Sequence, residues 1–234
     1  MFEQYILKNK VKVILVPQQN AHSVTVLVVF PVGSRYETAK MSGVSHYIEH
    51  LMFKGTTKRP NTLILTREID RLGAEYNAFT AKEHTGYYIK ADSKFIATSL
   101  DILSDMLFNS LFDKKEMERE KTVIVEELRM YKDNPIMNVE NIFEQMMYQA
   151  PLGRDIGGTE KTVMSFNRAD VLEFKHKYYD PANTTIVVAG DISESTKELL
   201  EKYFGAEANK HAPFKHFQPA VFGTEAKAKR IFVE

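Results

Sequence analysis

Residues 43–56 read GVSHYIEHLMFKGT, and this stretch constrains the fold more than any other part of the 234-residue chain. Its apolar residues recur at spacings of three and four, as at Val44, Ile48 and Leu51. This period predicts an amphipathic helix with one buried face, closed by Gly55. The helix follows a segment rich in β-branched residues, so we expect it to lie just after a layer of strands.

Strand-forming segments flank this helix on both sides. Gln4–Leu7 and Val11–Val16 predict a hairpin, and Ser23–Phe30 predicts a third strand rich in valine. Further strands are expected at Glu75–Thr80 and Thr85–Ala91. Other helices are expected over residues 62–72, 93–108, 113–131, 139–148, 167–178 and 193–204, with one more strand over 184–189. Hairpins with clustered helices indicate an α+β fold with a mainly antiparallel β-sheet packed against several α-helices, not a doubly wound sheet.

The composition excludes several functional classes. There are no cysteines, which excludes disulfide frameworks, thiolate zinc sites, iron–sulfur clusters and cysteine nucleophiles. The chain has 31 basic residues (Lys plus Arg) and 31 acidic residues (Asp plus Glu). It therefore lacks the excess of basic residues that is typical of a protein that binds nucleic acid. No apolar run reaches the roughly 18 residues of a membrane span. The start of the sequence has no signal-peptide pattern, so we expect a cytoplasmic location and neither nucleic acid nor membrane as a partner.

The central stretch carries a candidate metal site. His46 and His50 are four residues apart, which places both imidazoles on one face of a helix, where they can bind one zinc ion. Glu49 can reach the rim of the same site, where a carboxylate can take a proton from water that zinc has made more acidic. This H-x-x-E-H order is the inverted form of the zinc-protease motif. The alternative is a surface helix with two solvated histidines.

A catalytic zinc needs a third protein ligand, and without cysteine this must be His, Asp or Glu. In the helix expected over 113–131, seven residues at about 100° each bring Glu127 to within about 20° of Glu120. Val123 and Ile124 lie near the same face, so we expect that face to be partly buried. A buried carboxylate needs a partner. From the residues alone, a metal ion and a basic side chain are both open.

At this point the chain resembles the pitrilysin, insulin-degrading enzyme and mitochondrial processing peptidase superfamily. The resemblance rests on residues 43–56, on Gly73–Thr80, on Glu120–Met130, and on Pro151–Gly153 and Tyr178–Asn183. It covers nearly the whole chain and is greatest to the bacterial and processing-peptidase branch. It implies a processing-peptidase-like metallohydrolase fold and a zinc-dependent endopeptidase that acts on unstructured peptides.

The resemblance also implies a role for each site residue. His46, His50 and Glu127 would ligate one Zn²⁺ per chain, and Glu49 would be the general base. Glu120 would be a supporting carboxylate that orients one of the ligands.

The same resemblance implies where substrate binds. Asn77, Ala78, Phe79 and Thr80 would form an edge strand that pairs with an extended peptide.

Enzymes of this superfamily pair two related halves around a chamber, and the second half supplies an Arg and a Tyr near the zinc. The resemblance implies that residues 1–204 form the zinc-bearing half and that 205–234 are a linker and the first strand of a second half. The expected partner is a second homologous half or subunit, or another copy of the chain. The chain by itself is then expected to be weakly active or inactive.

Other interpretations carry less. A non-catalytic relative that serves as a peptide-binding or scaffold subunit would lack a zinc ligand or the base, and all four residues are present. S-ribosylhomocysteine lyase uses a similar helix but needs a cysteine ligand, which excludes it. His84 is expected to be a solvated histidine at a strand edge. The loop over residues 153–158 lacks the context of a phosphate-binding loop.

Overall fold

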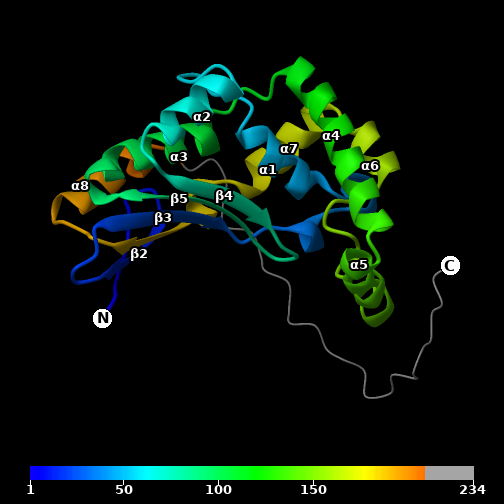
Figure 1. Ribbon diagram of the computed structural model, residues 1–234, viewed down its shortest axis with the longest axis horizontal. Coiled ribbons are helices and arrows are strands. Elements are labelled where there is room, and N and C mark those ends of the chain that lie inside the picture. The colour runs from blue at the N-terminus through cyan, green and yellow to red at the C-terminus, as the bar shows by residue number, and fades with distance from the viewer. Residues whose placement is uncertain (209–234) are drawn as a thin grey trace.

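The computed structural model describes residues 1–208 and is built on one six-stranded sheet in the order β1-β2-β6-β3-β5-β4 (Figure 1). Neighbouring strands are antiparallel except for β2 and β6, which run parallel. This confirms the α+β fold with a mainly antiparallel sheet. The strands are β1 (Glu3–Ile6), β2 (Lys12–Pro17), β3 (Ser23–Phe30), β4 (Glu75–Thr80), β5 (Thr85–Asp92) and β6 (Thr185–Gly190).

Figure 1 shows most helices gathered above the sheet, with α5 set apart below α4. The helices are α1 (Val44–Met52), α2 (Thr62–Asp70), α3 (Ile96–Asn109), α4 (Lys114–Asp133), α5 (Pro135–Met147), α6 (Glu160–Ser165), α7 (Arg168–Tyr178) and α8 (Ser195–Leu200). A π-helical turn, Glu201–Gly205, follows α8. Within residues 1–208, no helix has the length and apolar character that crossing a bilayer requires.

The core lies where the inward side chains of the central strands meet the helices. In β3 every second residue is buried, because side chains on a strand point alternately to its two faces. Val26 and Val28 have no exposed surface, and Leu100 and Leu107 of α3 are equally enclosed. Helix α1 packs against both α4 and the edge strand β4 of this sheet, and these three elements carry the candidate site residues.

The start of α1 rests on the glycine-rich loop. Gly43 adopts φ +94° and Gly158 adopts φ +79°, in the left-handed region that favours glycine. A Cβ on Gly43 would lie 2.4 Å from the carbonyl oxygen of Gly157, and a Cβ on Gly158 would lie 2.3 Å from that of Ser42. Backbone therefore packs directly on backbone here, and the loop positions the helix that carries the two histidines.

Glu37 supplies the cap that α1 lacks locally. Gly43 has no side chain to accept hydrogen bonds from the first N–H groups of the helix. The Glu37 carboxylate accepts them instead, from Gly43 N at 2.7 Å and from Ser45 N at 2.8 Å. A negative charge at a helix N-terminus is also favoured by the helix dipole. The start of α1 is thus fixed by a residue six positions upstream.

Several expected boundaries shift. Helix α1 ends at Met52, before Gly55, and α5 begins at Pro135 because Asn134 caps it. The helix expected over 193–204 divides into α8 and the π-helical turn, and α6 was not expected. The linker and strand expected over 205–234 lie, from residue 209 onward, outside the described residues.

Candidate metal centre

Helices α1 and α4 pack together and bring three potential ligands to one point. His46 Nε2 lies 3.2 Å from His50 Nε2. Glu127 Oε2 lies 3.5 Å from His50 Nε2 and 3.9 Å from His46 Nε2. Among residues 1–208, this is the group of His, Asp and Glu side chains whose ligand atoms converge, all within 4.8 Å of one another. The structure therefore places together the three residues that the sequence singled out.

The spacing of these atoms fits a tetrahedral ion. Zinc binds nitrogen and oxygen at about 2.0–2.1 Å, so two of its ligand atoms lie about 3.3 Å apart. The three measured separations, 3.2, 3.5 and 3.9 Å, lie close to that value. Two imidazoles and one carboxylate also form a donor set typical of catalytic zinc, with the fourth position open to water or substrate.

The His46 ring has the neutral charge state that a metal ligand requires. Burial, with a smaller contribution from neighbouring His50, lowers the pKa of His46 to about 4, so the ring is neutral near pH 7. A metal ligand must present a neutral imidazole. Its Nδ1 atom is buried and has no hydrogen-bond partner among the described residues. The Nε2 atom of His46 faces that of His50, so Nε2 is the nitrogen of this ring that is available to a cation.

Glu120 supports His50 from the opposite side. Its Oε1 atom lies 2.8 Å from His50 Nδ1, and its Oε2 atom lies 2.7 Å from Lys54 Nζ. Burial alone would raise the pKa of Glu120, but the hydrogen bonds to His50 and Lys54 outweigh it and lower this pKa. An ionised carboxylate only accepts, so His50 Nδ1 carries the proton and its Nε2 faces the site.

Glu49 lies at the rim of the site and is tied to strand β4. The hydroxyl of Thr80 donates to Glu49 Oε2 at 2.5 Å. Burial raises the pKa of Glu49, while the Thr80 bond and the charge of His50 oppose that rise. Glu127 lies near enough to raise this pKa further. The carboxylate is thus oriented beside the three converging donors and is biased toward holding a proton.

Strand β4 forms one edge of the sheet. It pairs with β5 on one side and with no strand of the described residues on the other. Of the four residues expected to face substrate, Asn77 and Phe79 are exposed, and Ala78 and Thr80 are half-buried. The Phe79 ring covers Gly86 of the adjacent strand, where a Cβ would collide with it.

Two contacts of the site were not predicted from the sequence, and one expectation about helix α4 was wrong. The Thr80–Glu49 bond and the Lys54–Glu120 ion pair join residues that are far apart in the chain, and only the spacing of Lys54 four residues after His50 was a signal. Val123 was expected on a buried face, but 48% of its surface is exposed, because only the Ile124 side of α4 is covered.

Among residues 1–208, no other histidine joins the converging group. His84 packs edge-on against Phe79, with ring centroids 5.8 Å apart, and is not part of the converging group. His211 and His216 lie outside the described residues.

The sequence of the chain is similar to that of one family of peptidases and to relatives that are named as peptidases. The family described as insulinase, peptidase family M16, matches residues 12–160, and that family's inactive domain matches residues 165–234. An uncharacterized zinc protease of Bacillus subtilis (strain 168) is 39% identical over 207 residues, which cover 88% of this chain and 50% of that protein. Mitochondrial-processing peptidase subunit beta of Bos taurus is 37% identical over 181 residues, 76% of this chain and 37% of that protein.

Solved structures show the same fold. A protease from Helicobacter pylori superposes with a TM-score of 0.86 at 27% identity, covering 95% of this chain and 54% of that one. Pitrilysin superposes with a TM-score of 0.82 at 24% identity, over 95% of this chain and 24% of that one, which shows the fold alone. The chain spans about half the length of the Bacillus subtilis relative. Strand β6, from the second matched stretch, lies between β2 and β3 of the first, so both stretches contribute to one sheet.

Proposed function

The chain belongs to the insulinase family of peptidases, family M16, and on that premise we propose that it is a zinc-dependent endopeptidase domain that hydrolyses peptide bonds in unstructured peptides. The observation that carries the proposal is the convergence of His46, His50 and Glu127 beside the Glu49 carboxylate. The names of relatives add support, since the protein of Bacillus subtilis is called a zinc protease.

The three converging residues would hold one zinc ion, and Glu120 would keep the His50 ring turned toward it. Zinc, when bound, would supply Lewis acidity toward a substrate carbonyl and toward water. Glu49 is the residue that moves the proton. Its carboxylate accepts a proton from the attacking water and delivers it to the nitrogen of the leaving amine.

Substrate is proposed to bind along β4 by strand addition. The outer edge of β4 offers backbone N–H and C=O groups to an extended chain, and Asn77 to Thr80 lie along it. A folded substrate has its backbone groups already paired, so this mode selects unstructured peptides. Because Thr80 also donates to Glu49, the strand that would bind substrate is connected to the base that would take the proton of the attacking water.

A second half or subunit is proposed to complete the enzyme. The chain covers 50% of the zinc protease of Bacillus subtilis and 37% of mitochondrial-processing peptidase subunit beta, whose name makes it one subunit of an assembly. We therefore expect weak or no peptide cleavage by the chain alone. Mass measurement with and without a candidate second half, together with a cleavage assay, tests this. Efficient turnover by a proven monomer would contradict it.

The Glu49→Gln variant tests the proposed chemistry. Glutamine keeps the shape of the side chain but cannot take a proton, so zinc content should stay at the wild-type level while cleavage of an extended peptide by the complete assembly falls by about a thousandfold or more. Glu118→Gln is the matched control, since Glu118 lies on the exposed side of α4 and pairs with Lys121. Cleavage that persists in clean Glu49→Gln protein would reject the mechanism. Absence of cleavage in the complete wild-type assembly would favour the non-catalytic alternative.

A further inference from the structure

Lys54 ends the stretch that carries the metal motif, yet the proposed chemistry gives it no role. Its Nζ atom lies 2.7 Å from Glu120 Oε2, while Glu120 Oε1 lies 2.8 Å from His50 Nδ1. We propose that Lys54 is a positioning residue for the metal centre, which holds the Glu120 carboxylate in the orientation that turns His50 Nε2 toward the ion. This inference rests on the proposed metal site and adds a residue that acts on it from outside.

Glu120 is buried, and only 4% of its side chain is exposed. Each of its two oxygens has one partner, His50 on Oε1 and Lys54 on Oε2. A carboxylate with a different donor on each oxygen cannot rotate without breaking a bond. Without Lys54, Oε2 would lose its cationic partner while it stays buried, which is costly. The carboxylate would then turn or admit water, and the His50 ring would lose its fixed direction.

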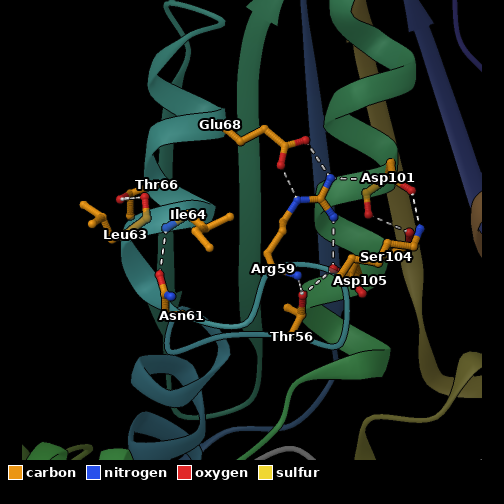
Figure 2. Close-up of polar contacts among 11 residues, drawn as sticks. Thr56, Arg59, Asn61, Leu63, Ile64, Thr66, Glu68, Asp101, Ser104 and Asp105 are labelled. Carbon is orange, nitrogen blue, oxygen red and sulfur yellow. Dashed lines mark hydrogen bonds and ion pairs between the residues drawn. The ribbon is translucent and has the colours of Figure 1, made fainter.

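The backbone N–H of Lys54 donates to the Leu51 carbonyl at 3.1 Å, and a buried polar cluster, drawn in Figure 2, fixes the loop that begins two residues later. Thr56 N donates to the Arg59 carbonyl at 2.7 Å, and the Thr56 hydroxyl donates to Asp105 of α3. The Arg59 guanidinium pairs with Asp105 at 3.0 Å and with Glu68 of α2 at 2.7 Å. The loop after Lys54 is therefore fixed to two helices. A flexible lysine that starts from a fixed backbone loses less conformational entropy when it pairs.

Electrostatic repulsion alone predicts the opposite change in zinc affinity when Lys54 is removed. The Lys54 ammonium repels a divalent cation, so on Coulomb attraction and repulsion only, its removal would tighten metal binding. Positioning predicts that its removal weakens binding, because the histidine is no longer oriented. The sign of the change in zinc affinity therefore separates the two accounts.

The experiment measures zinc dissociation constants by competition with a chromogenic chelator. Lys54→Met and Lys54→Gln should bind zinc about tenfold more weakly than the wild type, as expected for loss of a partner behind a ligand. Lys54→Arg, which keeps a cationic donor, should recover most of the affinity. Lys58→Met is the matched control, since Lys58 lies on the same segment, is 57% exposed and pairs only with Asp101 in the contacts described. It should bind zinc as the wild type does.

A second arm tests whether Lys54 acts through Glu120. In a Glu120→Gln background, adding Lys54→Met should cause no further loss of zinc affinity. Nitrogen-15 spectra of the His50 ring should show the Nδ1-protonated form in the zinc-free wild type and a mixture in Lys54→Met. The melting temperature of each zinc-free variant checks that the fold is retained.

The outcomes are distinct. Zinc binding by Lys54→Met and Lys54→Gln that equals or exceeds that of the wild type would overturn the inference and leave the proposed metal site intact. A wild-type chain that binds no zinc would instead overturn the proposed function.

Discussion

Thr80 would serve two proposed steps, since it lies in the strand proposed to bind substrate and also orients the proposed base, Glu49. The sequence placed it only in the peptide-binding strand, but its hydroxyl also donates to Glu49. Thr80→Val keeps the shape and removes the hydroxyl. We expect kcat to fall about tenfold, since a bond to a carboxylate is worth about 1.5 kcal/mol or more, with KM and zinc content little changed. Steady-state kinetics in an assembly that cleaves peptide measures this.

Thr80→Ser is the control for that change, because it retains the hydroxyl at the same position of β4. It should keep most of the wild-type kcat. A Thr80→Val enzyme with the wild-type kcat would show that the bond to Glu49 does not orient the base.

Glu37 makes the stability of the fold depend on pH, and its contribution can be measured separately from those of the other titrating groups. Burial raises the pKa of Glu37 to about 7, despite the N–H groups of Ser45 and Gly43 that favour the charged form. An acid whose pKa is higher in the folded protein than in the unfolded chain binds its proton more tightly when folded. Its contribution to stability is thus complete below about pH 4.5 and is lost as the pH rises through about 7.

The corresponding prediction compares urea unfolding of the zinc-free wild type and Glu37→Gln at about pH 5.5 and about pH 8. The wild type should lose more stability across this interval than the variant, by about 2 kcal/mol, because glutamine does not titrate. Contributions of other titrating groups cancel in the difference. Parallel pH profiles for the two proteins would contradict the assignment.

The helical period places the candidate ligands on shared faces, whereas the role of Glu127 as a ligand was implied only by the resemblance to the superfamily. His46 and His50 are one helical turn apart, and Glu127 shares a helix face with Glu120. The supporting contacts could not be predicted, because they depend on tertiary packing. Lys54 follows the C-terminal end of α1, and Glu120 lies in α4; these two segments meet only in the folded chain.

Helix α1 depends on the glycine loop that its sequence motif does not include. Gly158 approaches the Ser42 carbonyl so closely that an added Cβ would lie 2.3 Å from it. Gly158→Ala should therefore lower the free energy of unfolding by about 2–4 kcal/mol and weaken zinc binding, because the start of α1 must move. Urea unfolding and chelator competition measure the two effects.

Gly73→Ala is the matched control for backbone strain without collision. Gly73 adopts φ +60°, but a Cβ there would meet nothing within 4 Å. This variant should lose only the cost of the left-handed conformation, about 1–2 kcal/mol, and should bind zinc as the wild type does. Equal losses in the two variants would show that the loop does not support α1 sterically.

Strands were predicted better than connections between elements. The run of valines predicted β3 with the bounds that the structure shows, Ser23–Phe30, because β-branched residues favour strands. The parallel pairing of β2 with β6 was not predicted, because it joins segments more than 160 positions apart and no local period reports it. Helix α6 has only six residues, too short for a helical period to stand out.

In the molecule as a whole, helices α1 and α4 carry the candidate ligands, and α1 also packs against the edge strand β4 of the sheet. The chain covers about half of its curated relative, so we expect the complete enzyme to need a partner. Adding a candidate second half should raise peptide cleavage and solution mass together, and the Glu49→Gln chain should raise the mass alone. A rise in cleavage with no change in mass would contradict assembly as the cause.

The central claim is that His46, His50 and Glu127 hold one zinc ion. Metal analysis of the purified chain after dialysis against limiting zinc tests it most directly, with Glu127→Gln beside Glu126→Gln. Glu126 is next in sequence but points away and pairs with Arg129 on the surface. The wild type and Glu126→Gln should each retain one zinc per chain, and Glu127→Gln should retain far less. Equal zinc content in the Glu127→Gln chain, or none in the wild type, would contradict the account.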